Sequence, residues 1–329
     1  YQHWLACGAT EFPFWSLMLY GFLAVLPRIV VSYLVGLGIE FAVAQWRKEE
    51  IQEGFLVTGI LIPMICPIET PLWMIAVATA FSVIFVKEVF GGTGYNIFNV
   101  ALVTRAFLFF AYPAKMSGDQ VFVAHGSMLG IGPDLSGAAD AVTCATPLGQ
   151  VATSGATSAE AVGQAMTTAG GQAIDLWQMF LGLIPGSFGE TSTLCILFGG
   201  LLLLLTGIAS WKIMLSAFAG GAVIANCFAT PTYPASFLTV GEQLCLGGFA
   251  FAVVFMATDP VTSCRTGLGK YIYGFLVGVV AIIIRTYNNG YPEGAMLSVL
   301  LMNALAPLID YCVVEANVRR RLARVKNAE

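Results

Sequence analysis

Charged side chains are scarce in this chain: only 10% of its 329 residues are Asp, Glu, Lys or Arg. A soluble globular protein carries about 25% charged residues, so the shortage excludes an ordinary soluble domain. Hydrophobic residues make up 57% of the chain, and its mean hydropathy is +0.80. These values are typical of a protein whose main solvent is lipid.

Other absences exclude whole classes of site. The formal net charge is -4 and no basic patch alternates with aromatic residues, which argues against a nucleic-acid partner. The eight Cys form no CxxC pair, so the chain carries no signal for zinc or an iron–sulfur cluster. The two His, His3 and His125, lie too far apart in sequence to suggest bis-imidazole haem ligation. We therefore expect no metal site.

Long apolar stretches dominate what is present. They predict an all-α integral membrane protein, although several are too short to cross ~30 Å as a straight helix at ~1.5 Å per residue. Nine such segments lie near residues 18–45, 54–67, 72–88, 97–112, 192–209, 211–228, 243–258, 271–286 and 294–314.

Helix-breaking residues interrupt or bound the short segments. Pro63 and Pro67 lie in the second segment, 91–94 (GGTG) separates the third from the fourth, and Asp259-Pro260 ends the seventh. Broken helices leave backbone groups unpaired at membrane depth, which is tolerated only around a cavity or ligand. Ordinary kinked helices are the alternative.

The distribution of Lys and Arg orients the segments. By the positive-inside rule the C-terminus, with its basic tail at 315–329, is cytoplasmic. The loop at 113–175, which holds one Lys against five acids, then lies on the outer face, and residues 175–190 form a re-entrant or surface helix. The basic residues placed inside are Arg47, Lys48, Lys87, Lys212, Arg265, Lys270, Arg319, Arg320, Arg321, Arg324 and Lys326.

A chain that crosses the membrane nine times and ends in the cytoplasm must begin on the outer face. Because the chain begins at Tyr1 without a Met, we expect one further span upstream, which gives ten. Broken segments at 58–67 and 257–263 occupy comparable places, so we expect two five-helix halves of opposite orientation. The chain, 1–329, is then a single polytopic membrane domain.

The outer loop is the first place to look for chemistry. The segment 140–150 (DAVTCATPLGQ) consists mainly of small residues and hydroxyls with little to bury, and we expect Thr146 to present an exposed hydroxyl to a planar ligand. A second hydroxyl motif, 154–157 (SGAT), offers Thr157. Residues 151–173 are equally typical of a flexible linker. The residues alone leave the choice between the two threonines open.

Two carboxylates fall within apolar segments. Glu40 lies near the inner end of the first segment and Asp310 in the last. Ionisable groups inside a membrane are costly and therefore candidates for function. Their hard oxygen ligands suit Na⁺ or a proton relay. The alternative is that they pair with Arg47 or with the basic tail.

A glycine-rich stretch precedes the fourth segment. We expect 91–94 to open a helix on which Asn96 and Asn99, at i and i+3, project from one face. Amide side chains offer both a donor and an acceptor, as the pyrimidine edge of a flavin requires. The alternative is that an Asn here is only a helix cap.

These residues, together with several longer blocks, resemble the B-subunit family of the Na⁺-translocating NADH:quinone oxidoreductases (the NqrB/RnfD family). The resemblance covers essentially the whole chain. Its most specific blocks are 87–94 (KEVFGGTG) and 105–113 (RAFLFFAYP). Further blocks are 116–119 (MSGD), 185–190 (PGSFGE), 208–212 (IASWK), 255–261 (FMATDPV) and 291–294 (YPEG).

The resemblance implies a ten-span fold similar to ammonium and urea channels, in the inner membrane of a bacterium. It implies a six-subunit complex, with C-, D-, E- and F-type subunits as partners. Covalent FMN, riboflavin and ubiquinone are the expected cofactors and substrate, and electron transfer to ubiquinone is coupled to Na⁺ export. NADH is not expected to bind this chain, which lacks a soluble dinucleotide-binding domain.

The family's FMN attachment pattern, D-G-x-S-G-A-T-x-L, falls on residues 140–148 and selects Thr146 for the phosphoester. Ala141, Thr143 and Cys144 replace its Gly, Ser and Gly. Thr157 lacks the preceding Asp and the following Leu, so the resemblance disfavours it.

The resemblance also assigns the other site residues. Riboflavin contacts correspond to Asn96 and Asn99, although Tyr95 and Val100 stand where the family often has Arg and Pro. The carboxylates of Na⁺ uptake correspond to Glu40 and Asp310, and the glycine pair of the quinone site to Gly36 and Leu37, where Leu37 departs from the family pattern.

Two alternatives remain open on the sequence. The related D subunit of the Rnf complex shares the FMN linkage but exchanges electrons with ferredoxin and NAD. A channel-like solute permease, which the fold analogy allows, would carry no flavin.

Overall fold

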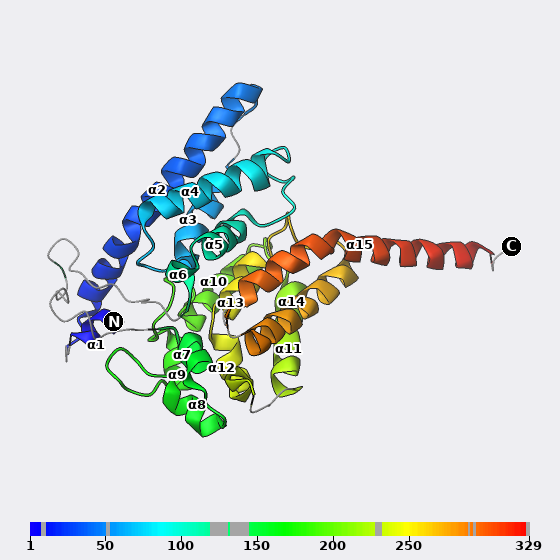
Figure 1. Ribbon diagram of the computed structural model, residues 1–329. Helices are drawn as coiled ribbons and strands as arrows, with labels where there is room; N and C mark the ends of the chain where they lie inside the picture. Colours follow the sequence, from blue (N-terminus) through cyan, green and yellow to red (C-terminus); the bar gives the residue numbers. More distant parts are fainter. Residues whose placement is uncertain are drawn as a thin grey trace.

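The computed structural model describes residues 1–7, 11–50, 53–118, 131, 145–227, 232–288, 290–291 and 294–326. Helices make up almost all of the regular structure in these residues (Figure 1), and an isolated bridge between Thr167 and Ala173 is the one β contact among them. The predicted all-helical class is therefore confirmed.

The first part of the chain forms helices that follow the predicted apolar segments closely. Asn99 sets the start of one of them, because its side chain accepts hydrogen bonds from the backbone N–H groups of Ala101 and Leu102. These elements are α1 (Gln2–Ala6), α2 (Phe14–Arg47), α3 (Phe55–Ile65), α4 (Leu72–Ser82), the π-helix η1 (Val83–Glu88), α5 (Val100–Ala111) and α6 (Pro113–Met116).

The second part resembles the first in having long apolar helices beside broken ones. The segment predicted at 243–258 is divided among three short elements rather than forming one helix. The elements are α10 (Thr193–Leu205), α11 (Trp211–Cys227), the 3₁₀ helix η3 (Pro234–Phe237), α12 (Val240–Cys245), α13 (Phe249–Phe251), the π-helix η4 (Ala252–Met256), α14 (Gly267–Tyr287) and α15 (Ala295–Lys326).

Among the described residues, three helices are long and apolar enough to cross a membrane: α2, α14 and α15. Four shorter apolar helices, α3, α5, α10 and α11, accompany them. A chain with this set of helices is suited to lipid, as the composition predicted. Of the short members, α3 contains Pro63 and α5 follows the glycine-rich stretch 91–94, as the breakers had marked, whereas α10 and α11 lie in segments without a marked breaker.

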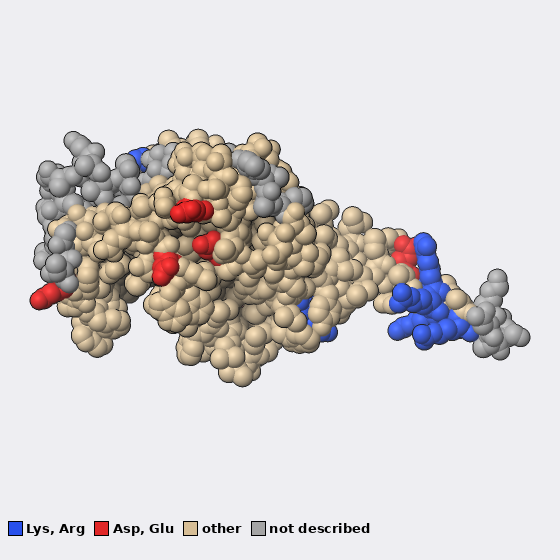
Figure 2. All heavy atoms as spheres, turned by 90° about the horizontal axis from the view of Figure 1, so that it is seen from below, with Lys and Arg blue, Asp and Glu red and all other residues tan. Residues whose placement is uncertain are grey.

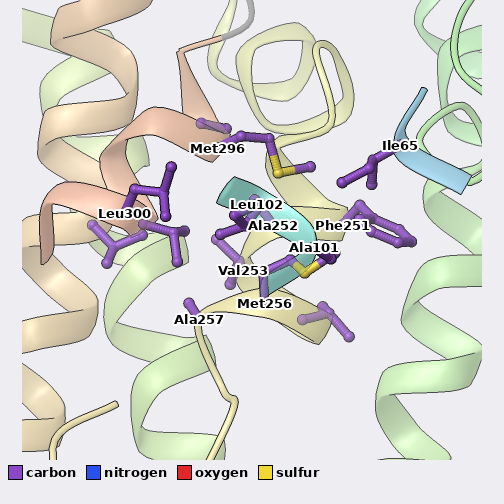
Figure 3. Packing of buried hydrophobic residues seen from close by; sticks show 14 of the residues in the cluster. Ile65, Ala101, Leu102, Phe251, Ala252, Val253, Met256, Ala257, Met296 and Leu300 are labelled. Atoms are coloured by element: carbon purple, nitrogen blue, oxygen red, sulfur yellow. The ribbon is translucent and has the colours of Figure 1, made fainter. Parts of the chain in front are cut away.

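The main hydrophobic core lies where the two parts of the chain meet. Figure 3 shows Ala101 and Leu102 of α5 packed between Val253 and Met256 of η4 and Met296 and Leu300 of α15. Burying these side chains brings the start of α5 against the broken segment of the second part. The core therefore positions the polar residues at these helix ends.

A smaller second core lies under the predicted outer loop. The helices α7 (Pro147–Ser154) and α8 (Ala159–Ala165) pack on each other and on η3, while α9 (Leu176–Leu181) packs beside α12 (Figure 1). The buried side chains are Leu148, Val151, Ala156, Val162, Met166, Ile174, Met179, Ile184, Ala235, Leu238 and Leu246. The expectation that this stretch has little to bury, and that 151–173 is a linker, is wrong: its few apolar residues are spaced so that each reaches one common core.

The predicted surface helix at 175–190 is only partly helical. It forms α9 and then ends at Gly182, whose backbone is left-handed with φ 90°. Asp175 and Gln178 form a capping box at its start.

The predicted basic tail continues α15 without a break. The last turns extend beyond the body of the protein (Figure 1), and Lys and Arg gather there in Figure 2 while the rest of that view carries few charges. The cluster consists of Arg319, Arg320, Arg321 and Arg324, with Arg319 also paired to Glu315.

Candidate flavin and ion sites

Thr146 caps the start of α7. Its hydroxyl accepts a hydrogen bond from the Gly149 N–H at 3.2 Å, and Pro147 occupies the first helical position, as is common at helix starts. The residue is only 5% exposed. The prediction of an exposed hydroxyl is therefore wrong, because capping turns the side chain toward the helix.

Two further contacts hold Thr146 in place. Its N–H and its hydroxyl both donate to the carbonyl of Gly118, at 2.9 and 3.2 Å. Gln150, one turn along α7, uses its side chain to bond Ala145 and Thr167. The structure thus joins the MSGD block to the FMN pattern across 28 residues, although 119 and 140–144 lie outside the described residues.

Thr157 has the opposite surroundings. It is exposed and follows Gly155, the left-handed residue that ends α7. Ser158, not Thr157, caps α8. Exposure alone therefore favours Thr157, whereas the helix N-terminus favours Thr146. A helix N-terminus carries partial positive charge and unpaired N–H groups, which stabilise an attached phosphate.

The two asparagines do not share a helix face. Asn99 precedes the first residue of α5 and caps it, whereas Asn96 lies in the irregular turn before it and donates to the carbonyl of Phe98 at 3.0 Å. The prediction of a helix opened by 91–94 is wrong because Gly91, Gly92 and Gly94 all have left-handed backbones, which interrupt helical geometry.

Asn99 lines the cavity that carries most promise as a ligand site. It is about 570 Å³, within the ~300–1,000 Å³ of small-molecule sites. Apolar residues of α3, including Val57 and Met64, form much of the wall. Its polar groups are Thr58, Thr93, Asn99, Thr258 and Asp259.

Asp259 ties this cavity to both parts of the chain. It accepts a hydrogen bond from the Asn99 amide at 3.4 Å and another from the Thr262 hydroxyl at 3.0 Å. The sequence marked Asp259 as a helix breaker and as part of the block 255–261, but nothing in it indicated a pairing with Asn99. Tyr273 and Asn303 bond to each other nearby in the buried core at 2.8 Å.

Glu40 pairs with Lys87 rather than with Arg47. Both partners are buried, and the Lys87 ammonium also lies 5.8 Å from the centre of the Phe55 ring. Arg47 instead reaches Glu88, at 3.7 Å between side chains. The second carboxylate oxygen of Glu40, Oε2, has no hydrogen-bond partner among the described residues.

Asp310 anchors the start of α14. Its carboxylate accepts from the N–H groups of Arg265 and Thr266, at 2.7 and 3.1 Å, and from the Thr266 hydroxyl at 2.6 Å. Thr266 in turn caps α14. The two predicted ion carboxylates therefore differ: Asp310 has a donor on each oxygen, and Glu40 does not.

Gly36 lies beneath the ring of Phe55. A Cβ at this position would overlap the ring carbons, so only glycine lets α2 approach α3 here. Leu37 is half-buried against the main core.

A buried pair that the sequence had not connected lies at the other end of α3. Arg105 of α5 pairs with Glu190 and also donates to the carbonyl of Ile65, the last residue of α3, at 2.7 Å. The sequence placed both residues in separate family blocks, but nothing in their spacing joined them.

Comparison with known proteins supports the sequence resemblance. A family model described as the NQR2, RnfD, RnfE family matches residues 4–319. The chain belongs to this family.

Relatives of this NQR2, RnfD, RnfE family member are named as the B subunit of a Na(+)-translocating NADH-quinone reductase. The protein of Yersinia pestis is 45% identical over 312 residues, which cover 94% of this chain and 71% of the relative. That of Chromohalobacter salexigens is 44% identical over 313 residues, covering 94% and 70%. That of Klebsiella pneumoniae (strain 342) is 43% identical over 326 residues, covering 98% and 74%.

Within this family member the predicted site residues fall into two groups. Thr146 belongs to the second core around α7, whereas Asn99, Glu40, Gly36 and Asp310 belong to the main bundle. The structure therefore separates a candidate flavin attachment site from candidate ligand and ion sites in the bundle.

Proposed function

We propose that this chain is the membrane subunit of a Na⁺-pumping NADH:ubiquinone reductase, which carries electrons from covalent FMN through riboflavin to ubiquinone and couples them to Na⁺ export. The observation that carries the proposal is Thr146. Its hydroxyl stands at the N-terminus of α7, where the Gly149 N–H is directed at it. The names of the relatives supply the reaction and the ion.

The chain's residues fit a phosphoester at Thr146. The positive end of α7 would stabilise the phosphate, and the Thr146–Gly118 hydrogen bond would be given up when the ester forms. When bound, flavins supply the redox chemistry, and the protein contributes position and electrostatic surroundings. Gln150 would keep the attachment point fixed through its bonds to Ala145 and Thr167.

The cavity beside Asn99 fits riboflavin. Its apolar wall suits a planar ring system, and the Asn99 amide keeps one N–H that no bond within the described residues requires. Asp259 orients that amide. Asn96 would contribute from the turn before α5.

We place ion uptake at Glu40 with support from Asp310, and the quinone near Gly36 and Leu37. The free oxygen of Glu40 offers a hard ligand, while Asp310 keeps the start of α14 in position. The close approach of α2 and α3 at Gly36 would shape the quinone site.

The proposed setting is a six-subunit complex in the bacterial inner membrane, with the FMN loop periplasmic and the C-terminus cytoplasmic. Ten spans in two inverted halves agree with the packing: α4 contacts α2 and α5 in the first half, as α14 contacts α11 and α15 in the second. Each half would also contain one broken segment.

Activity of the purified complex tests the proposal. We expect NADH to reduce ubiquinone in a Na⁺-stimulated reaction, with no exchange between ferredoxin and NAD. The reverse result would favour the D subunit of the Rnf complex, which the family also includes. A complex that is inactive with both pairs of substrates and binds no flavin would favour a permease.

A further inference from the structure

Three buried hydroxyls stand out on the helices that meet at Glu40. They are Ser32 on α2 and Thr79 and Ser82 on α4, each 0% exposed, and α2 and α4 pack together. None has a hydrogen-bond partner among the described residues. A buried hydroxyl without a partner costs free energy, so a cluster of them needs an explanation.

Several other buried hydroxyls in the described helices are satisfied locally. Thr104 donates to the carbonyl of Val100 and Ser298 to that of Ala295, at 2.9 and 2.8 Å. Helical Ser and Thr usually bond one turn back in this way. Ser32, Thr79 and Ser82 make no such bond, and neither does Thr193 at the start of α10. The first three differ from Thr193 because they lie on two helices, α2 and α4, that pack together.

The ion pair fixes how this interface lines up. Glu40 of α2 meets Lys87 of η1, and the two helices run in the same general direction (Figure 1). Ser32 lies eight residues before Glu40, and Thr79 lies eight residues before Lys87, so each hydroxyl stands about two helical turns from the ion pair. Ser82 lies between that level and Lys87. The hydroxyls are therefore expected at neighbouring levels of the packed α2 and α4, beyond Glu40, and we call Glu40, Ser32, Thr79 and Ser82 together the polar line.

Two more features mark this line. The Oε2 atom of Glu40, a residue only 5% exposed, has no partner among the described residues. The helix opposite widens into the π-helix η1, where the Val89 N–H bonds the carbonyl of Ile84, five residues back. Such π-helical turns occur frequently at functional sites.

The α11–α14 interface, which occupies the matching place in the second half, brings the two helix backbones into direct contact instead. A Cβ at Gly274 would lie 2.5 Å from the carbonyl oxygen of Ile213, and one at Gly278 would overlap that of Ala217. Ser216 there bonds its own helix at Ile213. The polar line is therefore a property of α2 and α4 and is not repeated at this interface of the second half.

We propose that Ser32, Thr79 and Ser82 form a transit site for Na⁺ between α2 and α4, reached from Glu40. Hydroxyl oxygens are hard ligands, and because they are neutral they would hold the ion weakly enough to release it. Lys87 balances the single carboxylate, which suits a monovalent rather than a divalent cation. The inference rests on the proposed function, since it names a route for the pumped ion.

Variants of the complete complex test the site. With Ser32→Ala and with Thr79→Val we expect the Na⁺ concentration for half-maximal quinone reduction to rise about tenfold, the usual scale for losing one polar contact to a charge. Uptake of ²²Na⁺ into proteoliposomes should fall in parallel. Thermal stability should not fall, because these hydroxyls make no hydrogen bond with the described residues, and Thr79→Ser should restore Na⁺ affinity.

Ser216→Ala is the matched control, because it removes a bonded hydroxyl from the matching interface and should leave the Na⁺ dependence unchanged. An unchanged Na⁺ response in Ser32→Ala and Thr79→Val, when the unmodified complex responds, overturns the transit site alone. So does a loss of stability that Thr79→Ser repairs without any change in Na⁺ affinity. Absence of any Na⁺ response in the unmodified complex overturns the proposed function instead.

Discussion

At the residue scale, Gly36 shows how one missing side chain shapes the bundle. The ring of Phe55 occupies the space where a Cβ would lie, and the same ring is close to the Lys87 ammonium. The approach of α2 to α3 and the surroundings of the Glu40–Lys87 pair therefore depend on the same contact.

We predict that Gly36→Ala destabilises the protein by about 1–3 kcal/mol, because the methyl group must displace a fully buried ring. Gly38→Ala is the control: nothing lies within 4 Å of a Cβ there, so the change should be neutral or stabilise the helix by up to about 1 kcal/mol. Thermal unfolding of the purified complex measures both. Equal melting temperatures for the two variants would contradict the close contact.

Glu40 and Asp310 should also respond differently to substitution. Glu40→Gln should raise the Na⁺ concentration needed for half-maximal activity, because it removes the charge beside a free ligand atom. Asp310→Ala should lower stability by about 1–3 kcal/mol, because three donors at the start of α14 lose their acceptor. Na⁺ titrations and unfolding curves separate the two effects. A stable Asp310→Ala protein would show that this anchoring is dispensable.

At the scale of elements, two buried arginines hold the ends of short helices. Arg105 donates to the last carbonyl of α3, and Arg285 donates to the carbonyls of Gln243 and Leu246 at the end of α12. A helix C-terminus carries partial negative charge, so a guanidinium there is stabilising. Each arginine ties a broken segment to a longer neighbour.

We predict that Arg105→Met destabilises the protein by about 3–5 kcal/mol, because it leaves Glu190 buried without its cation. The double variant Arg105→Met with Glu190→Gln should recover part of that loss. Unfolding of the single and double variants measures the coupling. A double variant less stable than the single one would contradict the pairing.

The element boundaries show where sequence reasoning succeeds and where it fails. Hydrophobic runs located α2, α11 and α14 well, because burial in lipid demands long apolar stretches. The start of α5 was placed three residues early, since the turn geometry of Gly91 to Gly94 cannot be inferred from composition. The packing of α7 was missed because its few apolar residues become a core only when α8, α9 and η3 join them.

The candidate site residues could likewise be predicted only in part from the sequence. Spacing and resemblance identified Thr146, and the structure adds that it is a buried helix cap. The position of Glu40 in an apolar segment made it a candidate and the resemblance then gave it a role, but its partner Lys87 lies 47 residues away and could not be inferred. The pairing of Asp259 with Asn99 escaped notice because it spans 160 residues.

At the scale of the whole molecule, the proposed orientation requires the second core and the basic arm to lie on opposite sides of the membrane. The second core surrounds α7, whereas the arginine cluster ends α15 (Figures 1 and 2). Each has an exposed residue beside it: Thr157 follows α7 in the second core, and Arg324 belongs to the arginine cluster.

Single cysteines at these tips test that arrangement. In a protein whose native cysteines are replaced, Thr157→Cys should react with a membrane-impermeant maleimide. The cells used have a permeabilised outer membrane and an intact inner membrane. Arg324→Cys should react only after the inner membrane is opened. Labelling of both from the same side would contradict the proposed orientation.

The most direct test of the central claim is to find where flavin is attached. The chain, produced with a flavin transferase, should give a fluorescent band on a denaturing gel, and mass mapping should place FMN on the peptide containing Thr146. The signal should survive Thr157→Ala and vanish in Thr146→Asn, since Asn can still cap α7 but offers no hydroxyl. A dark band, or FMN mapped to Thr157, would contradict the account.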